Sequence, residues 1–324
     1  MYINVTGVSS EILKNLVLAG VKASICDARP FPDAVRDTPS FLLPPAATTT
    51  TTIAARTNLA AKKDINSSEE QATKKVKYET VGEALKPVVE DLNLLLGPCE
   101  IVNLTVADLI ANGRDQLMEF PIVVASRIVP QEAIQISKIV AGAGNKFFMA
   151  DCFGLCGASA MDLGEHSFRP EMGKKLLDPI SLTPQIPLET MISVPLQDAV
   201  NRFHKKHPPT GWMKYRAILE YCQLSGAWPT TDKADDFAGK IQTWIQNTSP
   251  TLADHEVFQA NSLKTLATVA TAEVAPICAV LGGILGNEVI KAISGKGEPA
   301  NNTILFDGET CKAWTFCVRP NETK

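Results

Sequence analysis

The chain has 324 residues, 45% of them hydrophobic, and a formal net charge of −4 at pH 7. This length suffices for one large domain, or for one domain with a sizeable insertion. The slightly acidic balance argues against nucleic acid or a membrane surface as a main partner. Eight cysteines without a Cys-x-x-Cys pair indicate buried free thiols in a reducing compartment, and argue against a disulfide framework or a zinc site.

The first residues have neither a basic patch nor a long apolar run, so no secretory signal is predicted. The longest uncharged apolar run, 274–286, is too short to cross a bilayer. We therefore expect a soluble, intracellular protein.

The N-terminal elements predict the β-α-β order of a parallel, doubly wound sheet. Residues 2–8 predict the end of a buried strand, and 9–21 carry an apolar helical stripe that stops at Gly20. Residues 22–28 predict a short strand that ends at Asp27. This start of an α/β domain extends over 1–43.

The next segment, 44–77, is rich in Thr, Ala, Lys and Ser and has no aromatic residue. Such a composition cannot bury enough apolar surface to offset the entropy of ordering, so a disordered insertion is predicted. The α/β domain continues over 78–168. The elements expected there are a helix, two strands, a helix and two strands around a glycine turn, at 81–96, 100–106, 120–126, 130–144 and 145–163.

A loop and helical insertion is predicted over 169–270, because its first part is rich in proline and its second part has helical periodicity. Its helices are expected at 195–207, 211–226 and 234–247. Residues 271–319 then complete the α/β domain with a helix and two strands.

The helix predicted at 276–295 contains Gly282, Gly283 and Gly286. Each glycine costs about 1 kcal/mol relative to alanine inside a helix, so some packing must offset the loss. Together with Ala279 they recur every three to four residues, which predicts a helix face almost without side chains, where another backbone approaches closely. The alternative is a glycine-rich core helix whose only partner is its own sheet.

This region resembles the small subunits of SUMO-activating enzymes, a family within the ubiquitin-activating, ThiF-like superfamily. The shared motif runs over 276–288 and continues with Asn301, Asn302 and 306–308. A second block agrees, from Phe147 and Phe148 through Asp151 and Phe153-Gly154 to the Leu-Gly-Glu-His of 163–166. The resemblance implies a Rossmann-like (ThiF-type) sheet with a helical insertion.

Adenylation in that superfamily uses a glycine-rich cradle after the first strand, where bare backbone approaches phosphate. Against the family's three glycines, this chain has Asn4, Gly7 and Ser9, so only Gly7 remains. Asp27 stands where Rossmann-like folds bind a ribose, or it is a solvated carboxylate at a strand end. Gly7 and Asp27 therefore mark a degenerate pocket.

The superfamily's catalytic members carry an Asp-Asn motif after the fourth strand, and its Asp serves Mg²⁺. Ser126 and Arg127 stand at that place here, so the metal ligand is missing. We expect no catalytic residue, no metal ligand and no bound cofactor in this chain, with ATP and Mg²⁺ used by a larger partner subunit. Inert core thiols are expected at Cys152, Cys156, Cys222 and Cys278.

Two short patterns lie at the end of the insertion. Lys74–Lys77 fits a minimal nuclear import patch, and Lys77 in "VKYE" fits a SUMO acceptor site, with a solvated linker as the alternative for both. A nuclear and cytoplasmic protein is expected.

The resemblance implies a non-catalytic regulatory subunit that docks on a larger catalytic subunit and supports SUMO activation. The family's arginine-bearing helix ahead of the first strand has no counterpart, so either the start is truncated or the subunit works without that arginine. The alternatives are a regulatory subunit of the NEDD8-activating enzyme, a stand-alone ThiF-like adenylyltransferase or dinucleotide oxidoreductase, and a decayed paralogue without a partner.

Overall fold

The computed structural model describes residues 1–31, 40, 42–43, 78–173, 175–199 and 209–320. The predicted disordered insertion 44–77, with Lys77 in it, lies outside the described residues. So does most of the helix predicted at 195–207, of which the structure describes a 3-10 turn at Leu196–Asp198.

A central sheet of eight strands runs in the order β12-β11-β6-β5-β4-β1-β2-β3. Its strands are β1 (Tyr2–Ile3), β2 (Ser24–Cys26), β3 (Glu100–Ile101), β4 (Ile122–Ala125), β5 (Lys146–Phe153), β6 (Cys156–Asp162), β11 (Thr303–Asp307) and β12 (Lys312–Phe316). The five strands from β3 to β5 are parallel, and β6, β11 and β12 extend the sheet in antiparallel pairs. This confirms the predicted α/β class with a mostly parallel, Rossmann-like sheet.

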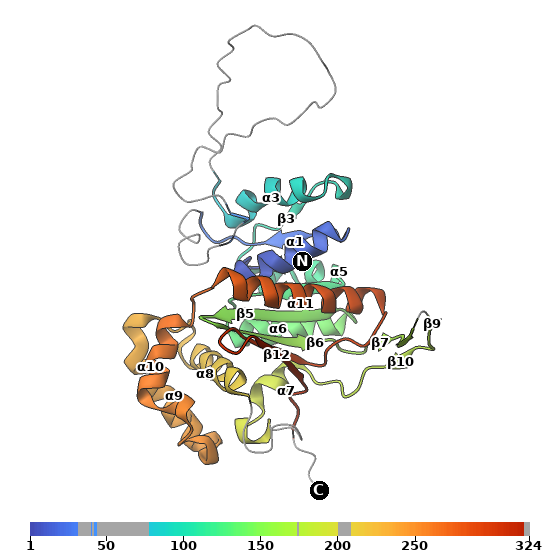
Figure 1. Cartoon of the computed structure of the whole chain (residues 1–324). Helices are drawn as coiled ribbons and strands as arrows, with labels where there is room; N and C mark the ends of the chain where they lie inside the picture. The colour runs from blue at the N-terminus through green and yellow to red at the C-terminus, as the bar shows by residue number, and fades with distance from the viewer. Residues whose placement is uncertain (32–39, 41, 44–77, 174, 200–208, 321–324) are drawn as a thin grey trace.

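Helices cover both faces of the sheet (Figure 1). One face carries α1 (Gly7–Leu18), α3 (Val81–Leu92) and α11 (Ala275–Ser294), which bury their apolar sides in one hydrophobic cluster. The other carries α4 (Val106–Asn112), α5 (Arg114–Glu119), α6 (Pro130–Gly142), α7 (Leu188–Ser193) and α8 (Thr210–Ser225) in a second cluster. The strand order reverses between β1 and β4, the place where open α/β sheets bind ligands.

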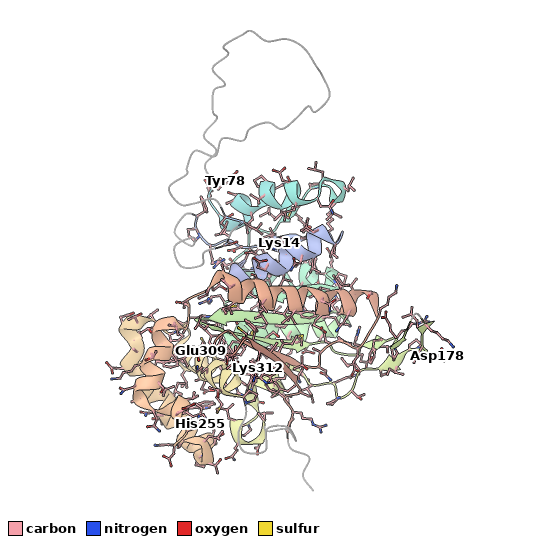
Figure 2. The ribbon with its side chains drawn as sticks, viewed as in Figure 1. Lys14, Tyr78, Asp178, His255, Glu309 and Lys312 are labelled. Atoms are coloured by element: carbon pink, nitrogen blue, oxygen red, sulfur yellow. The ribbon has the colours of Figure 1, made fainter. Side chains whose placement is uncertain are left out.

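The first helix begins where its sequence supplies a cap. Thr6 is the N-cap, and its backbone N–H donates to Ser9 Oγ at 2.7 Å. Val8, Ile12 and Leu16 are buried on the core side, while Lys14 lies toward solvent and pairs with Glu11 at 2.6 Å (Figure 2). Helical periodicity and a polar cap thus place the start of α1 directly after β1.

One strand is shorter in the structure than the sequence predicts, and one helix was not predicted. The strand predicted at 100–106 stops after Ile101, because Thr105 caps α4 and its Oγ accepts from the Asp108 N–H at 3.1 Å. The helix α10 (Ala260–Val269) has no counterpart among the predicted elements, although Leu263 and Leu266 on it are buried. The predicted helices 211–226 and 234–247 are confirmed as α8 and α9 (Ala234–Thr248).

The glycines of α11 face two directions. A Cβ on Gly282 would clash with Glu11 Cβ and lie 3.1 Å from the Val8 carbonyl oxygen, and one on Gly286 would lie 3.4 Å from Asn15 Cβ. Both glycines therefore let α1 and α11 pack closely. Ala279 and Gly283 are exposed, and a Cβ on Gly283 would meet nothing within 4 Å.

Within the described residues, α11 alone is long and apolar enough to cross a membrane by length and composition. Half of that apolar stretch is buried inside the fold. Its closest packing is against α1, so the structure accounts for its apolar composition as that of a core helix.

Candidate functional site

The loops after β1, β2 and β4 meet at the switch point of the sheet. They carry Gly7, Asp27 and the pair Ser126-Arg127, so the structure brings the sequence-predicted pocket residues together. Asn4 and Arg127 have positive φ angles of 55° and 54°, which turns the chain sharply at the ends of β1 and β4.

A carboxylate of the chain itself lies at the N-terminus of α1. The Gly7 N–H donates to Glu273 Oε2 at 2.7 Å, and the Val8 N–H lies 3.5 Å from Glu273 Oε1. The Glu273 side chain is 1% exposed. Because a helix N-terminus attracts anions through its free N–H groups and its dipole, Glu273 takes the position that suits a phosphate.

The glycine at position 7 makes room for this internal arrangement. A Cβ on Gly7 would lie 3.0 Å from Cys278 Sγ and 3.1 Å from Glu273 Oε2. In this chain the bare backbone of Gly7 thus faces a thiol and a carboxylate of its own fold.

Asp27 is buried and fully engaged, unlike the solvated strand-end carboxylate considered from the sequence. Its Oδ2 accepts from the Val5 N–H at 2.8 Å, and both of its oxygens accept from the Arg29 guanidinium, at 2.8 and 2.6 Å. Arg29 also donates to the Val5 carbonyl oxygen at 2.9 Å. Asp27 therefore fixes the β1 and β2 loops to each other, and a ribose hydroxyl would have to compete with these bonds.

A buried cation stands where a metal-binding Asp-Asn motif was sought. The Arg127 side chain is 10% exposed, lies 3.9 Å from Glu273 Oε1 and stacks 4.7 Å from the centre of the Trp228 ring. Its Nη2 donates to the Thr271 carbonyl oxygen at 3.2 Å. Since a guanidinium has no acceptor, Ser126-Arg127 does not supply the carboxylate that binds magnesium in the Asp-Asn motif.

Asp151 joins this cluster from β5. It accepts from the Arg127 backbone N–H at 2.7 Å and from the Tyr215 hydroxyl at 2.7 Å. Burial raises the pKa of Asp151 above its ordinary value, although the Arg127 charge and the Tyr215 hydrogen bond oppose that rise.

Each described thiol whose pKa departs from the ordinary cysteine value has a raised pKa. Burial raises the pKa of Cys26 and of Cys99 to about 11, and it raises the pKa of Cys156 and Cys222 as well. A raised pKa keeps a thiol protonated near neutral pH, whereas catalytic cysteines have a lowered one.

Sequence reasoning missed Glu273, Arg29 and Trp228. Glu273 lies 266 residues from Gly7 in the chain, so no local pattern links them. The available signal for Glu273 was its position directly before the apolar start of α11, where a lone carboxylate next to a buried segment needs a partner.

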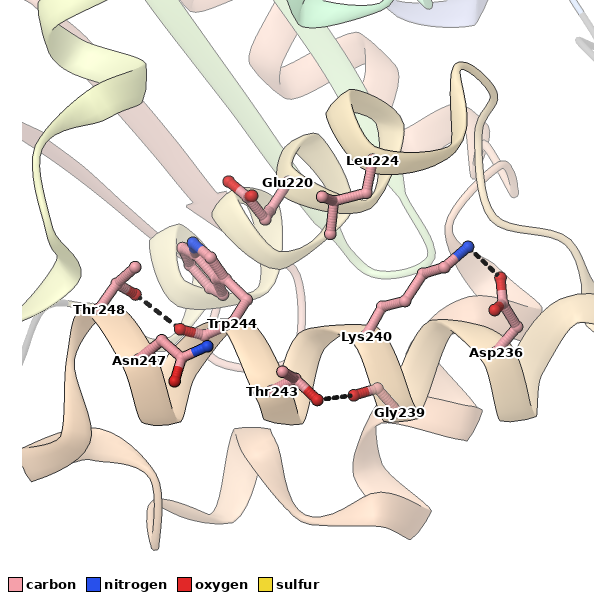
Figure 3. A pocket seen from close by; sticks show the side chains of 9 residues that line it. All are labelled: Glu220, Leu224, Asp236, Gly239, Lys240, Thr243, Trp244, Asn247 and Thr248. Carbon is pink, nitrogen blue, oxygen red and sulfur yellow. Dashed lines mark hydrogen bonds and ion pairs between the residues drawn. The ribbon is translucent and has the colours of Figure 1, made fainter.

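Two larger cavities lie away from the switch point. One, of about 690 Å³, is lined by Glu220 and Leu224 of α8 and by Lys240 and Trp244 of α9 (Figure 3). The other, of about 560 Å³, lies between the turn at Gly154 and α10. Neither contains Gly7, Asp27 or the glycines of α11.

Curated relatives match along nearly the whole chain, whereas no family model matches it. SUMO-activating enzyme subunit 1 of Xenopus laevis is 24% identical over 343 aligned positions, which cover 98% of this chain and 88% of that protein. SUMO-activating enzyme subunit 1B-1 of Arabidopsis thaliana is 27% identical over 317 positions, covering 95% and 85%. Subunit 1A from the same plant is 28% identical, covering 72% and 70%.

The chain is similar to subunit 1 of SUMO-activating enzymes. The similarity extends well beyond the motifs at 276–288 and 163–166 on which the resemblance in the sequence rested. The role of a small, regulatory subunit stays a prediction.

Proposed function

We propose that this chain is the non-catalytic subunit of a heterodimeric SUMO-activating enzyme. The observation that carries the proposal is its similarity to proteins named SUMO-activating enzyme subunit 1 over 95–98% of its length. In this role the chain supports ATP-dependent adenylation of SUMO and the following thioester transfer, and the larger subunit performs both steps.

The geometry at the switch point supports the non-catalytic part of the proposal. Glu273 accepts from the N–H at the α1 N-terminus, Ser126-Arg127 stands where the Asp-Asn motif was sought, and Asp27 forms an ion pair with Arg29. An incoming triphosphate would meet a buried carboxylate at the place where it needs N–H donors, and like charges in a desolvated site repel strongly.

The proposal includes the partners and the setting of the chain. They are the larger catalytic subunit and SUMO, with no nucleic acid and no membrane, in the nucleus and the cytoplasm. ATP and Mg²⁺ are used by the larger subunit, and this chain binds no cofactor in that reaction.

ATP–pyrophosphate exchange tests the division of labour. The full chain is assayed alone, then with a purified catalytic subunit and SUMO, and SUMO thioester formation is followed on non-reducing gels. We expect exchange and thioester only in the mixture. Robust exchange by the chain alone, or a thioester on one of its own cysteines, would contradict the proposal and favour a stand-alone ThiF-like enzyme.

Co-purification identifies the modifier pathway. The tagged chain is incubated with the catalytic subunits of SUMO and NEDD8 activation in parallel. Stable association with the first is expected. Preference for the second would reassign the chain to NEDD8 activation, and association with neither would indicate a paralogue without a partner.

A further inference from the structure

Two thiols and a carboxylate converge beneath the N-terminus of α1. Cys152 Sγ comes from β5, Cys278 Sγ from the first turn of α11, and the Glu273 carboxylate from the residues just before that helix. These ligand atoms all lie within 4.8 Å of one another. The two cysteines are 0% and 3% exposed and the Glu273 side chain is 1% exposed.

We propose that Cys152, Cys278 and Glu273 form a binding site for a thiophilic divalent cation, with Zn²⁺ as the fitting ion. Thiolate and carboxylate are both ordinary zinc ligands, and a tetrahedral ion with three protein ligands takes water as the fourth. Two sulfurs among the three ligands favour zinc over the hard cations Mg²⁺ and Ca²⁺, which select oxygen.

The charges of the three ligands, the ion and Arg127 sum to zero. Two thiolates and the carboxylate carry −3, while Zn²⁺ and the Arg127 guanidinium, 3.9 Å from Glu273 Oε1, together carry +3. A buried cluster of ions is tolerated when it is paired and hydrogen-bonded. The Gly7 N–H, which donates to Glu273 Oε2 at 2.7 Å, supplies such a bond.

The geometry leaves donor capacity on the ligand atoms. Glu273 Oε1 lies 3.5 Å from the Val8 nitrogen and 3.9 Å from Arg127 Nη2, and both distances are longer than the 2.7 Å bond that Oε2 accepts from the Gly7 N–H. A Cβ at position 7 would lie 3.0 Å from Cys278 Sγ, and glycine there keeps that side of the thiol clear.

Metal binding would exchange protons for the ion. Two S–H bonds break, two Zn–S bonds and one Zn–O bond form, and two protons pass to solvent. The bound ion would join β5, α11 and, through Glu273, the start of α1.

Cobalt titration of the full chain tests the site, because thiolate-bound Co²⁺ absorbs characteristically in the near ultraviolet and visible. The protein is stripped of metal with a chelator under reducing, oxygen-free conditions and titrated with Co²⁺, then with Zn²⁺. We expect thiolate–cobalt absorption that saturates at one ion per chain and disappears when Zn²⁺ displaces the cobalt.

Variants locate the ligands. Cys278→Ser and Glu273→Gln should each weaken cobalt binding by at least about tenfold. Cys222→Ser, which alters another buried thiol on α8, should leave binding unchanged. Absence of thiolate–cobalt absorption in the wild type would overturn the proposal. Cobalt binding by Cys278→Ser as strong as that of the wild type would also overturn it, and would assign the ion to other thiols such as the exposed Cys311.

A measurement on the unmodified sequence keeps the proposal testable if a variant fails to fold. Cysteine alkylation during partial unfolding is mapped by mass spectrometry with and without Zn²⁺. Zn²⁺ should slow the labelling of Cys152 and Cys278 by at least about tenfold relative to Cys222, because metal-bound thiolates are withheld from the reagent. Equal labelling of all three thiols would overturn the proposal.

Discussion

The Glu273 carboxylate has three neighbours of different kinds: the Gly7 N–H, the Arg127 guanidinium and the thiol pair. Each contact connects the residues before α11 to an element formed by a distant part of the chain. One side chain therefore both lies at the N-terminus of α1, where an anion is favoured, and stabilises the charge of Arg127.

Removing that carboxylate should destabilise the protein. Glu273→Ala leaves Arg127 buried without its nearby carboxylate and the Gly7 N–H without an acceptor, so we expect a loss of about 2–4 kcal/mol in the free energy of unfolding. Urea denaturation followed by circular dichroism measures it. Glu273→Gln keeps the acceptor for Gly7 and should lose only about 1–2 kcal/mol. Wild-type stability in the alanine variant would show that the contact contributes nothing.

Asp151 should make stability depend on pH with a definite sign. Its pKa is raised in the folded protein, mainly by burial, so the folded state holds the proton more tightly than the unfolded chain. Its contribution to the free energy of unfolding is therefore fully present below the ordinary carboxyl pKa near 4 and declines as the pH rises through the raised value.

Asp151→Asn is the matched variant, because an amide keeps a hydrogen-bonding group of the same shape and cannot titrate. We expect the stability of the wild type relative to Asp151→Asn to fall between pH 4 and pH 7, measured by urea unfolding at each pH. A relative stability that rises over this range would mean that Arg127 and Tyr215 outweigh burial and lower the pKa.

At the scale of the helices, the packing of α1 on α11 depends on two glycines. Gly282 and Gly286 face α1, while Gly283 faces away from the fold. Helix propensity disfavours all three by similar amounts. Comparing substitutions at Gly282 and Gly283 therefore separates the effect of close packing from that of helix propensity.

Alanine substitutions should have opposite effects at neighbouring positions. Gly282→Ala forces a methyl group against Glu11 and the Val8 carbonyl, so it should cost about 1–3 kcal/mol even after the gain in helix propensity. Gly283→Ala meets open space and should stabilise the protein by about 0.5–1 kcal/mol. Thermal unfolding of both variants checks this, and equal effects would contradict the assigned packing.

At the scale of the whole molecule, the outer face of α11 remains available for a partner. Val280 and Ile290 are 43% and 38% exposed on this helix, and the exposed Ala279 and Gly283 add little side-chain volume. A smooth apolar face of this kind suits close contact with another protein. The partner contact expected from the sequence at Ala279 and Gly283 thus stays a prediction, while Gly282 and Gly286 pack inside the fold.

Gly283→Arg tests that contact on the assembled enzyme. The side chain would extend into open space and leave the fold intact, but it would place a charge in the proposed interface. We expect calorimetry to show at least about tenfold weaker association with the catalytic subunit, because an apolar interface tolerates an unpaired charge poorly. Gly142→Arg, on the exposed end of α6, is the control. Unchanged association of Gly283→Arg would exclude this face.

Local patterns were enough to predict much of the fold. Apolar periodicity gave the β-α-β start, α6, α8, α9 and α11, because a helix or strand that buries one face repeats its apolar residues at a fixed interval. The same patterns missed α10 and placed a strand over the cap of α4, where the apolar residues are few and a polar cap decides the conformation. They also left open which side of α11 each glycine faces.

By itself the sequence determined that only Gly7 matches the three-glycine turn of the family it resembles and that no Asp directly follows β4, since these are identities at positions within one loop. Only the tertiary structure decided what occupies the pocket instead. Glu273 reaches Gly7 across 266 residues, and Cys152 and Cys278 meet from different elements. Such contacts depend on how the sheet and its helices pack in three dimensions, and no interval along the chain records them.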